Sequence, residues 1–258
     1  MRFIDVDFDF TSDTPGYWDD FWTRRNGLGL GRLDPDTFSP TLREYHKSLW
    51  SRELPNGEHM ILEDDPSGYL QWNGMRFSSD SIAASFRYER CRELLKSVES
   101  DMDDYHAFIE DFIHKTYTIG GSIIFPRHRN SINQIKGTNR YIADRWDLTL
   151  ECIRRYYSGE ESPISWCLEQ DKTFFDLFVN FRGYVEFFFL QDCVSKDYSE
   201  VNLWLDTDLF EKDPFPRNNK EYVSWISKNL DFVNKRNRRI FSFIHDNNLE
   251  SPDFGKYT

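Results

Sequence analysis

The sequence predicts an α+β fold, a mainly helical domain with a small antiparallel β-sheet. Helical periodicity is clearest at residues 142–157 and 222–244, where apolar side chains recur at the spacing of a helix face. Residues 59–77 contain two strand-like runs joined by the turn sequence DPSG, which is typical of a hairpin. With 258 residues, of which 17% are aromatic, the chain can bury a sizeable core.

The chain is expected to form a single domain over residues 1–258. An extended, loop-rich N-terminal part covers residues 1–56, where turn sequences such as LDPDTFSP separate short segments. A hairpin and helical body covers residues 57–258. In the N-terminal part, the alternation of FIDVDFDF predicts a half-buried strand at residues 3–10, and residues 41–50 predict a short helix.

The body is expected to combine several helices with a few short strands. The polar run SSDS at residues 78–81 is typical of a helix N-cap and predicts a helix at residues 82–98. The remaining predicted elements are a helix at 103–114, a strand ending at Pro126, the helix at 142–157, an aromatic-rich helical region from Pro163 interrupted near Gly183, a short strand at 200–206 and the helix at 222–244.

Composition disfavours several classes of protein. A net charge of −12 argues against non-specific binding to nucleic acid or to anionic membranes. The most apolar window, residues 174–194, is interrupted by charged residues, so no membrane span is expected. The opening MRFIDVDFDF lacks the apolar run of a signal peptide, and no two cysteines form a C-x-x-C pair. We therefore expect a cytoplasmic protein with reduced thiols at Cys91, Cys152, Cys167 and Cys193.

The candidate ligand site is a basic loop that precedes the helix predicted at 142–157. A helix N-terminus favours anions, and arginine side chains match the geometry of phosphate or carboxylate. We expect this loop to bind a nucleotide or another phosphorylated small molecule. The alternative is a solvated connection whose arginines pair with the acidic surface. The predicted ligand-binding residues are Arg127, Arg129, Asn133, Lys136, Asn139 and Arg140.

Two residues near this loop are weak candidates for catalysis. His128 lies among basic residues, which favour the neutral imidazole that a general base requires. Asp144 could hold a metal ion or a ribose hydroxyl. With Asp147 and Glu151, it lies on the polar face of the predicted helix, and arginines on that face favour a salt-bridged solvent surface. No metal site is predicted, because the histidines form no recognisable ligand pair.

Three longer sequence segments resemble those of a known protein family: DPDTFSPTLREYHKSLWSRELPNGE, IADRWDLTLECIRRYY and FRGYVEFFFLQDCV. They resemble a family of uncharacterised bacterial hypothetical proteins of unknown function. The resemblance covers most of the chain and implies a soluble protein of bacterial or phage-associated origin. It implies no catalytic residues.

Two classes of function therefore stay open. The first is a binder of a phosphorylated small molecule through the basic loop, with hydrolase or transferase chemistry as an extension. The alternative is a non-enzymatic module for protein–protein interaction. Its contacts would come from aromatic residues of the N-terminal part: Tyr17, Trp18, Phe21, Trp22, Phe38 and Trp50.

Overall fold

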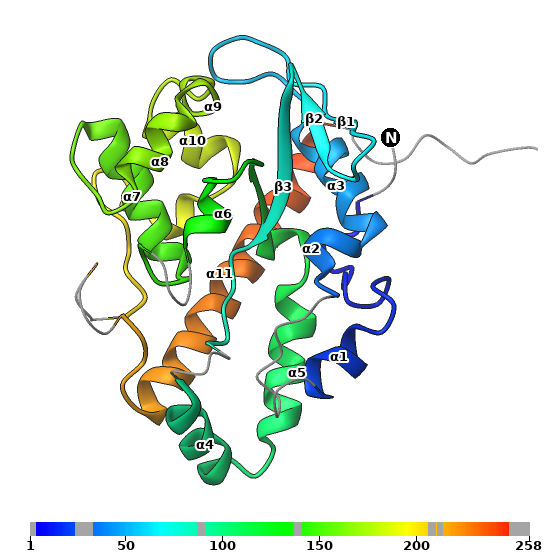
Figure 1. The fold of residues 1–258 in the computed structure, drawn as a ribbon, viewed down its shortest axis with the longest axis vertical. Helices are drawn as coiled ribbons and strands as arrows, with labels where there is room; N and C mark the ends of the chain where they lie inside the picture. Colours follow the sequence, from blue (N-terminus) through cyan, green and yellow to red (C-terminus); the bar gives the residue numbers. More distant parts are fainter. Residues whose placement is uncertain are drawn as a thin grey trace, which may run out of the picture.

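The fold is α+β, as predicted, with helices around a small antiparallel sheet (Figure 1). This computed structural model describes residues 4–23, 33–86, 91–136, 141–205, 210 and 214–247. The sheet has the order β1-β2-β3-β4 and comprises β1 (Glu63–Asp64), β2 (Leu70–Trp72), β3 (Met75–Ser81) and β4 (Ser122–Pro126). The helices are α1 (Tyr17–Thr23), α2 (Pro35–Phe38), α3 (Pro40–Trp50), α4 (Arg92–Asp101), α5 (Tyr105–Thr116), α6 (Ile132–Ile135), α7 (Trp146–Ser158), α8 (Ser165–Gln170), α9 (Lys172–Asp176), α10 (Phe181–Phe187) and α11 (Asn219–Asp246).

The predicted hairpin is confirmed, and a second hairpin follows it directly. β1 pairs with β2, and Gly68 in the turn between them has a φ of 90°. Asn73 and Gly74, both at positive φ, then reverse the chain into β3. The predicted helix cap at 78–81 is wrong, because these residues continue β3 and pair with β4. The helix predicted from residue 82 begins only at Arg92.

The strand predicted at the N-terminus is also wrong. Buried Ile4, Val6 and Phe10 do alternate with exposed aspartates, but the described residues from 4 to 10 form turns and not a strand. The Asp5 carboxylate accepts a hydrogen bond from the backbone N–H of Asp7 at 3.0 Å, an interaction that favours a local turn over a ladder. The helix predicted at 41–50 is confirmed as α3, which Ser39 caps.

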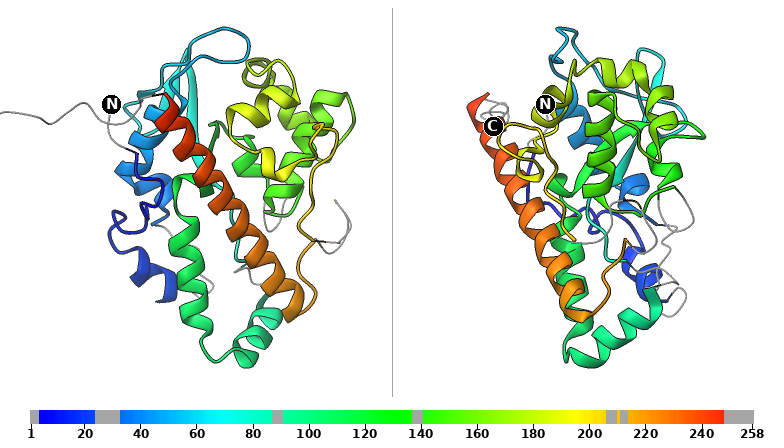
Figure 2. Two further views of the ribbon diagram at one scale, coloured as in Figure 1. Left: turned by 180° about the vertical axis from the view of Figure 1, so that it is seen from behind. Right: turned by 90° about the vertical axis from the view of Figure 1, so that its left-hand side faces the viewer.

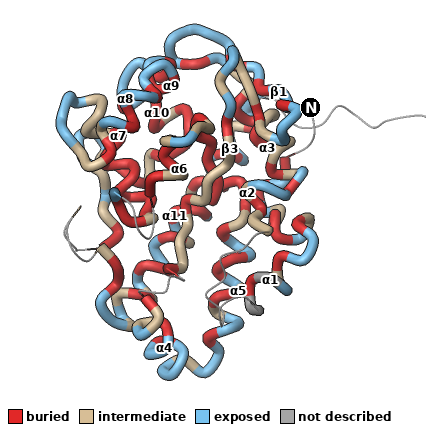
Figure 3. The backbone as a smooth tube through the Cα atoms, in the orientation of Figure 1, coloured by how far each residue is buried: buried red, intermediate tan, exposed pale blue. Residues whose placement is uncertain are grey.

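The final helix is confirmed as α11, which runs beside α5 along one side of the molecule (Figure 2). Its fully buried Arg236 donates to the carbonyls of Gly120 at 2.8 Å and Ser122 at 2.7 Å. Burial lowers the pKa of Arg236 to about 9. A Cβ on Gly120 would lie 2.3 Å from the Asn237 side-chain oxygen, so glycine is needed for this close approach. These contacts pack α11 against β4, all five residues of which are buried. Buried positions lie toward the centre of the molecule and exposed positions on its outside (Figure 3).

Helix α7 begins at Trp146, later than predicted, and the polar face predicted for it is wrong at Asp147. That side chain is fully buried and accepts two hydrogen bonds from Arg145, at 3.0 and 2.5 Å. It also accepts one from the backbone of Trp204 at 2.8 Å. The predicted pairing with arginine is confirmed for Glu151, which lies 2.8 Å from Arg155, but the predicted solvent exposure is wrong, because Glu151 is buried.

The aromatic-rich region after Pro163 is helical, as predicted, in three short pieces, α8 to α10. The interruption predicted near Gly183 lies slightly earlier, before α10, where Asn180 caps the helix. Gly183 itself is inside α10. The strand predicted at 200–206 is reduced, within the described residues, to one bridge between Val194 and Val201.

Candidate functional site

The predicted basic loop has an outer part, which contains Arg127, His128 and Arg129, and an inner part, which contains Asn133 and Lys136. Arg129 is exposed, and the half-buried Arg127 lies 5.3 Å from the centre of the Tyr69 ring. His128 has both ring nitrogens engaged: Nε2 lies 2.8 Å from an Asp171 carboxylate oxygen, and Nδ1 accepts from the backbone N–H of Asn130 at 3.2 Å. These contacts connect the loop to Asp171, at the start of α9. The predicted site residues Asn139 and Arg140 lie outside the described residues.

The inner part of the loop points toward β3. Asn133 donates to the Ser78 hydroxyl at 2.6 Å and accepts from Ser131 at 2.7 Å. The Lys136 side chain is only 4% exposed, and its Nζ lies 2.7 Å from Asp80 and 2.8 Å from Asp144. Two carboxylates thus contact the single positive charge of Lys136. The structure brings together Lys136 and Asp144, two of the predicted site residues. The Lys136 ammonium is paired there with the carboxylates of Asp80 and Asp144.

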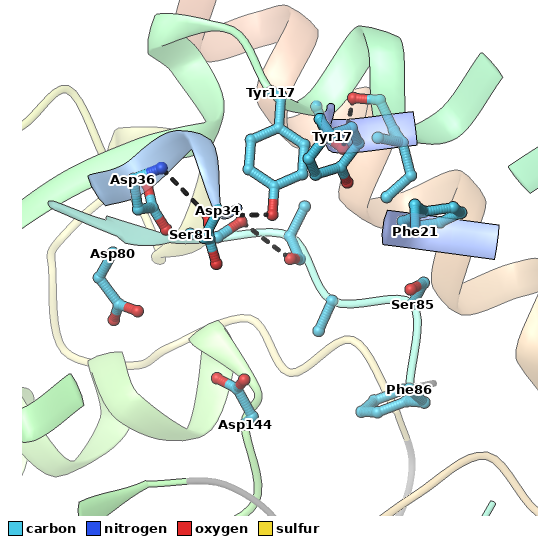
Figure 4. A pocket seen from close by; sticks show the side chains of 14 residues that line it. Tyr17, Phe21, Asp34, Asp36, Asp80, Ser81, Ser85, Phe86, Tyr117 and Asp144 are labelled. Carbon is cyan, nitrogen blue, oxygen red and sulfur yellow. Dashed lines mark hydrogen bonds between the residues drawn. The ribbon is translucent and has the colours of Figure 1, made fainter. Parts of the chain in front are cut away.

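Asp144 and Asp80 face a pocket that the sequence did not reveal (Figure 4). The cavity has a volume of about 210 Å³. It lies between α1, the start of α2, the end of β3 and the end of α5. Its lining combines carboxylates with aromatic rings and comprises Tyr17, Phe21, Asp34, Asp36, Asp80, Ser81, Ala83, Ala84, Ser85, Phe86, Ile113, Thr116, Tyr117 and Asp144.

Asp34 and Asp36 reach this pocket because they begin helix α2. The Asp34 carboxylate caps the helix by accepting from the backbone N–H of Asp36 at 3.0 Å. It also accepts from the Tyr117 hydroxyl at 3.5 Å. The side chain of Asp36 accepts from the Ser79 hydroxyl at 2.8 Å. Each carboxylate is therefore held by hydrogen bonds from a separate element.

Three carboxyl groups of the pocket, those of Asp34, Asp36 and Asp80, have pKa values raised above that of a free aspartate. Burial raises the pKa of Asp34. Burial, followed by the charges of Asp34 and Asp80, raises the pKa of Asp36 well above its usual range. Burial also raises the pKa of Asp80 to about 6, although the adjacent Lys136 acts in the opposite direction. For Lys136 burial lowers the pKa, but the Asp144 and Asp80 carboxylates outweigh it and the net shift is upward.

A hydrogen-bond chain connects Asp36 to the core. Trp50 donates to Nδ1 of His46 at 2.8 Å, and Nε2 of His46 lies 3.0 Å from the Ser79 hydroxyl. Burial lowers the pKa of His46 to about 3, so the ring is neutral and carries its proton on Nε2. His46 therefore donates to Ser79, which in turn donates to Asp36. The chain fixes the direction of the Asp36 carboxyl.

The aromatic residues proposed for protein contacts are mostly interior. Tyr17, Phe21 and Trp50 are buried, and the first two line the pocket. Trp18 is half-buried and Phe38 is 48% exposed. The side chain of Trp22 lies outside what the structure describes.

Comparison with known proteins identifies the family to which this chain is similar. A family model described as "Family of unknown function (DUF6994)" matches residues 4–240. No curated protein and no solved structure matches the chain. In the described ranges, no helix has the length and apolar character needed to cross a membrane, and no three His, Cys, Asp or Glu side chains are grouped to hold a metal ion.

Proposed function

Because the chain belongs to DUF6994, a family of unknown function, we propose its role from geometry: the carboxylate pocket binds a small polar molecule and acts on it. One observation carries the proposal. Asp36 on α2, Asp80 on β3 and Asp144 in the loop before α7 converge on one cavity, with Lys136 held between Asp80 and Asp144. Convergence of titratable groups on a cavity is typical of binding and catalytic sites.

Acid–base catalysis is the chemistry that this set of groups supports. Hydrolysis and group transfer both need a proton donor and a proton acceptor beside the substrate. Asp36, with its strongly raised pKa, is suited to donate a proton. Asp80, with a pKa of about 6, can change its protonation state near neutral pH. We therefore propose a hydrolase or transferase that uses these two carboxyl groups.

A thermal-shift screen with a library of polar metabolites tests this proposal. Asp36→Asn removes the titratable group but keeps an oxygen that can accept from Ser79. The matched control is Asp7→Asn, because Asp7 is exposed. Ligands that stabilise the wild type and the control should lose their effect in Asp36→Asn. Equal stabilisation of all three proteins would place the binding site elsewhere.

A second candidate is binding of a phosphorylated small molecule by the outer part of the basic loop. The observation that favours it is the position of Arg129, exposed on the loop, and of Arg127 beside the Tyr69 ring. Arginine and an aromatic ring together suit a nucleotide. Nucleotides and sugar phosphates should then stabilise the wild type but not the double variant Arg127→Gln/Arg129→Gln. The interaction module has less support, since three of its six proposed contact residues, Tyr17, Phe21 and Trp50, are buried.

We also propose that the protein works in the cytoplasm. None of the four cysteines forms a disulfide and all four are buried, as a reducing compartment favours. Burial raises the pKa of Cys152 and of Cys167 to about 12, which disfavours the reactive thiolate. All four thiols should react with a thiol reagent in denaturant without reductant, and fewer than four would contradict this proposal.

A further inference from the structure

We infer that a one-way hydrogen-bond chain from the core places the acidic proton of Asp36 on Oδ2, the carboxyl oxygen left to a molecule in the cavity. The members of the chain are Trp50, His46 and Ser79, and each is a positioning residue that acts through Asp36. This inference rests on the proposed function, in which Asp36 donates a proton. The chain begins at Trp50 and His46, both buried, and ends at a side chain that lines the cavity (Figure 4).

The direction of the chain follows from its first donor. The indole nitrogen of Trp50 can only donate a hydrogen bond, and it lies 2.8 Å from Nδ1 of His46. Nδ1 is therefore the acceptor, and the neutral ring carries its single proton on Nε2. That nitrogen lies 3.0 Å from the Ser79 hydroxyl. His46 thus donates to Ser79 and cannot remove its proton.

The last step of the chain selects one oxygen of Asp36. The Ser79 hydroxyl lies 2.8 Å from Oδ1 of this carboxyl group. If Asp36 donated through Oδ1, the hydroxyl proton of Ser79 would have no acceptor among the described residues, because His46 also donates to that hydroxyl. Ser79 is therefore the donor to Oδ1. A protonated Asp36 then carries its proton on Oδ2, where a substrate in the cavity can receive it.

The order of the groups distinguishes this chain from a serine nucleophile with its base. In a serine–histidine–aspartate triad, the histidine lies between the other two groups and takes the proton of the serine. Here Ser79 lies between the histidine and the aspartate. Burial also lowers the pKa of His46 to about 3, which disfavours the imidazolium that proton removal would form. Ser79 therefore positions Asp36 and does not attack a substrate.

The chain acts on Asp36 in addition to the charges around it. Asp34 and Asp80 disfavour ionisation of Asp36, whereas Lys136 favours it. The hydrogen bond from Ser79 also favours the ionised form. When Oδ2 gives its proton to a bound molecule, this hydrogen bond stays in place and stabilises the carboxylate that remains. The chain thus orients the acid and supports its conjugate base.

Nuclear magnetic resonance of the wild type tests the direction of the chain. In protein labelled with 15N at histidine, His46 should show a proton on Nε2 and none on Nδ1. His46→Gln identifies its signals by their loss. A proton on Nδ1 would mean that the ring accepts from Ser79, and it would overturn the inference.

Titration of the Asp36 carboxyl group tests the last step. The 13C signal of this group is the aspartate signal that Asp36→Asn removes. Ser79→Ala should raise the pKa of Asp36, with about a tenfold loss in its acid dissociation constant, because a hydrogen bond to the ionised form is lost. The matched control is Ser78→Ala, since Ser78 contacts Asn133 and not Asp36. This control and Ser79→Thr, which keeps the hydroxyl, should titrate as the wild type does.

The outcomes separate the chain from the proposed function. Equal pKa values of Asp36 in Ser79→Ala and Ser78→Ala would overturn the inference, and so would labelling of Ser79 by a serine-directed fluorophosphonate. Urea unfolding verifies that the variants are folded, and the histidine spectrum of the wild type decides the direction of the chain in any case. If the spectra agree with the inference but no metabolite response depends on Asp36, the proposed function is overturned and the position of the proton stands.

Discussion

Two clusters of charge lie close together in the sequence but differ in burial: the Arg145–Asp147 pair is fully buried, whereas Asp144, beside Lys136, has a side chain that is 34% exposed. In the first, Arg145 and Asp147 are both fully buried and pair one to one, and backbone groups of Trp204 and Pro214 complete their hydrogen bonds. In the second, Lys136 faces two carboxylates next to a cavity. A charge pair sealed in a core is a structural anchor, whereas titratable groups beside a cavity mark a site that can bind.

Removing the cation of the sealed pair should produce the largest change. Arg145→Met leaves Asp147 buried without its partner, so the free energy of unfolding should fall by about 3–5 kcal/mol. The measurement is equilibrium unfolding in urea. The double variant Arg145→Met/Asp147→Leu should regain part of the loss, because no unpaired charge remains. A loss below about 1 kcal/mol for the single variant would show that this pair is not an anchor.

The pH dependence of stability should reveal the raised pKa of Asp80 in the second cluster. The folded pKa of Asp80, about 6, lies above its ordinary value of 3.8, so the folded state binds this proton more strongly. The stability that the proton contributes is present below about pH 4 and lost as the pH rises through about 6. Relative to Asp80→Asn, the wild type should therefore lose about 2–3 kcal/mol across this window.

Urea unfolding of both proteins at several pH values provides this comparison. Asp7→Asn is the control and should follow the wild type, since Asp7 is exposed. Parallel curves for the wild type and Asp80→Asn would contradict the raised pKa and weaken the assignment of Asp80 as a catalytic group.

Removing the cation of the second cluster should cost less than removing Arg145. Lys136→Met leaves Asp80 and Asp144 close together, but Asp80 can relieve the repulsion by binding a proton. We expect a loss of about 2 kcal/mol near neutral pH that shrinks in acid. Urea unfolding at two pH values measures both features. A loss as large as that of Arg145→Met, and independent of pH, would make the two clusters equivalent.

Elements whose own periodicity is strong could be predicted from the sequence. α11 and the first hairpin are examples, because their apolar stripe and turn residues are local signals. The strand at Ser78–Ser81 could not be predicted, because a polar run is also typical of a helix cap. Only the pairing of these residues with β4 identifies them as a strand. Asp147 was placed on a polar surface because no local pattern indicates a buried partner at Arg145.

The candidate site was predicted only in part. Lys136 and Asp144 were named as separate anion-binding and catalytic residues, and the structure joins them in one ion pair. Asp34 and Asp36 lie in the turn sequence LDPDTF, which was used only to predict loops. Asp80 was assigned to a helix cap. These three aspartates meet through contacts between distant segments, and such convergence has no signature in a single sequence.

The smallest effect on stability should come from Arg129, on the same loop as Lys136. The two cations differ in their surroundings, because Arg129 is exposed and the Lys136 side chain is almost fully buried. Arg129→Gln should therefore change the free energy of unfolding by less than about 0.5 kcal/mol. Because the fold should stay intact, the effect of Arg129→Gln on ligand binding then distinguishes between the two candidate sites. If the pocket alone binds, polar metabolites that stabilise the wild type should stabilise Arg129→Gln equally, and nucleotides should stabilise neither. If nucleotides stabilise the wild type and not this variant, the outer part of the loop is an anion site, and exposed rather than buried charge carries that function.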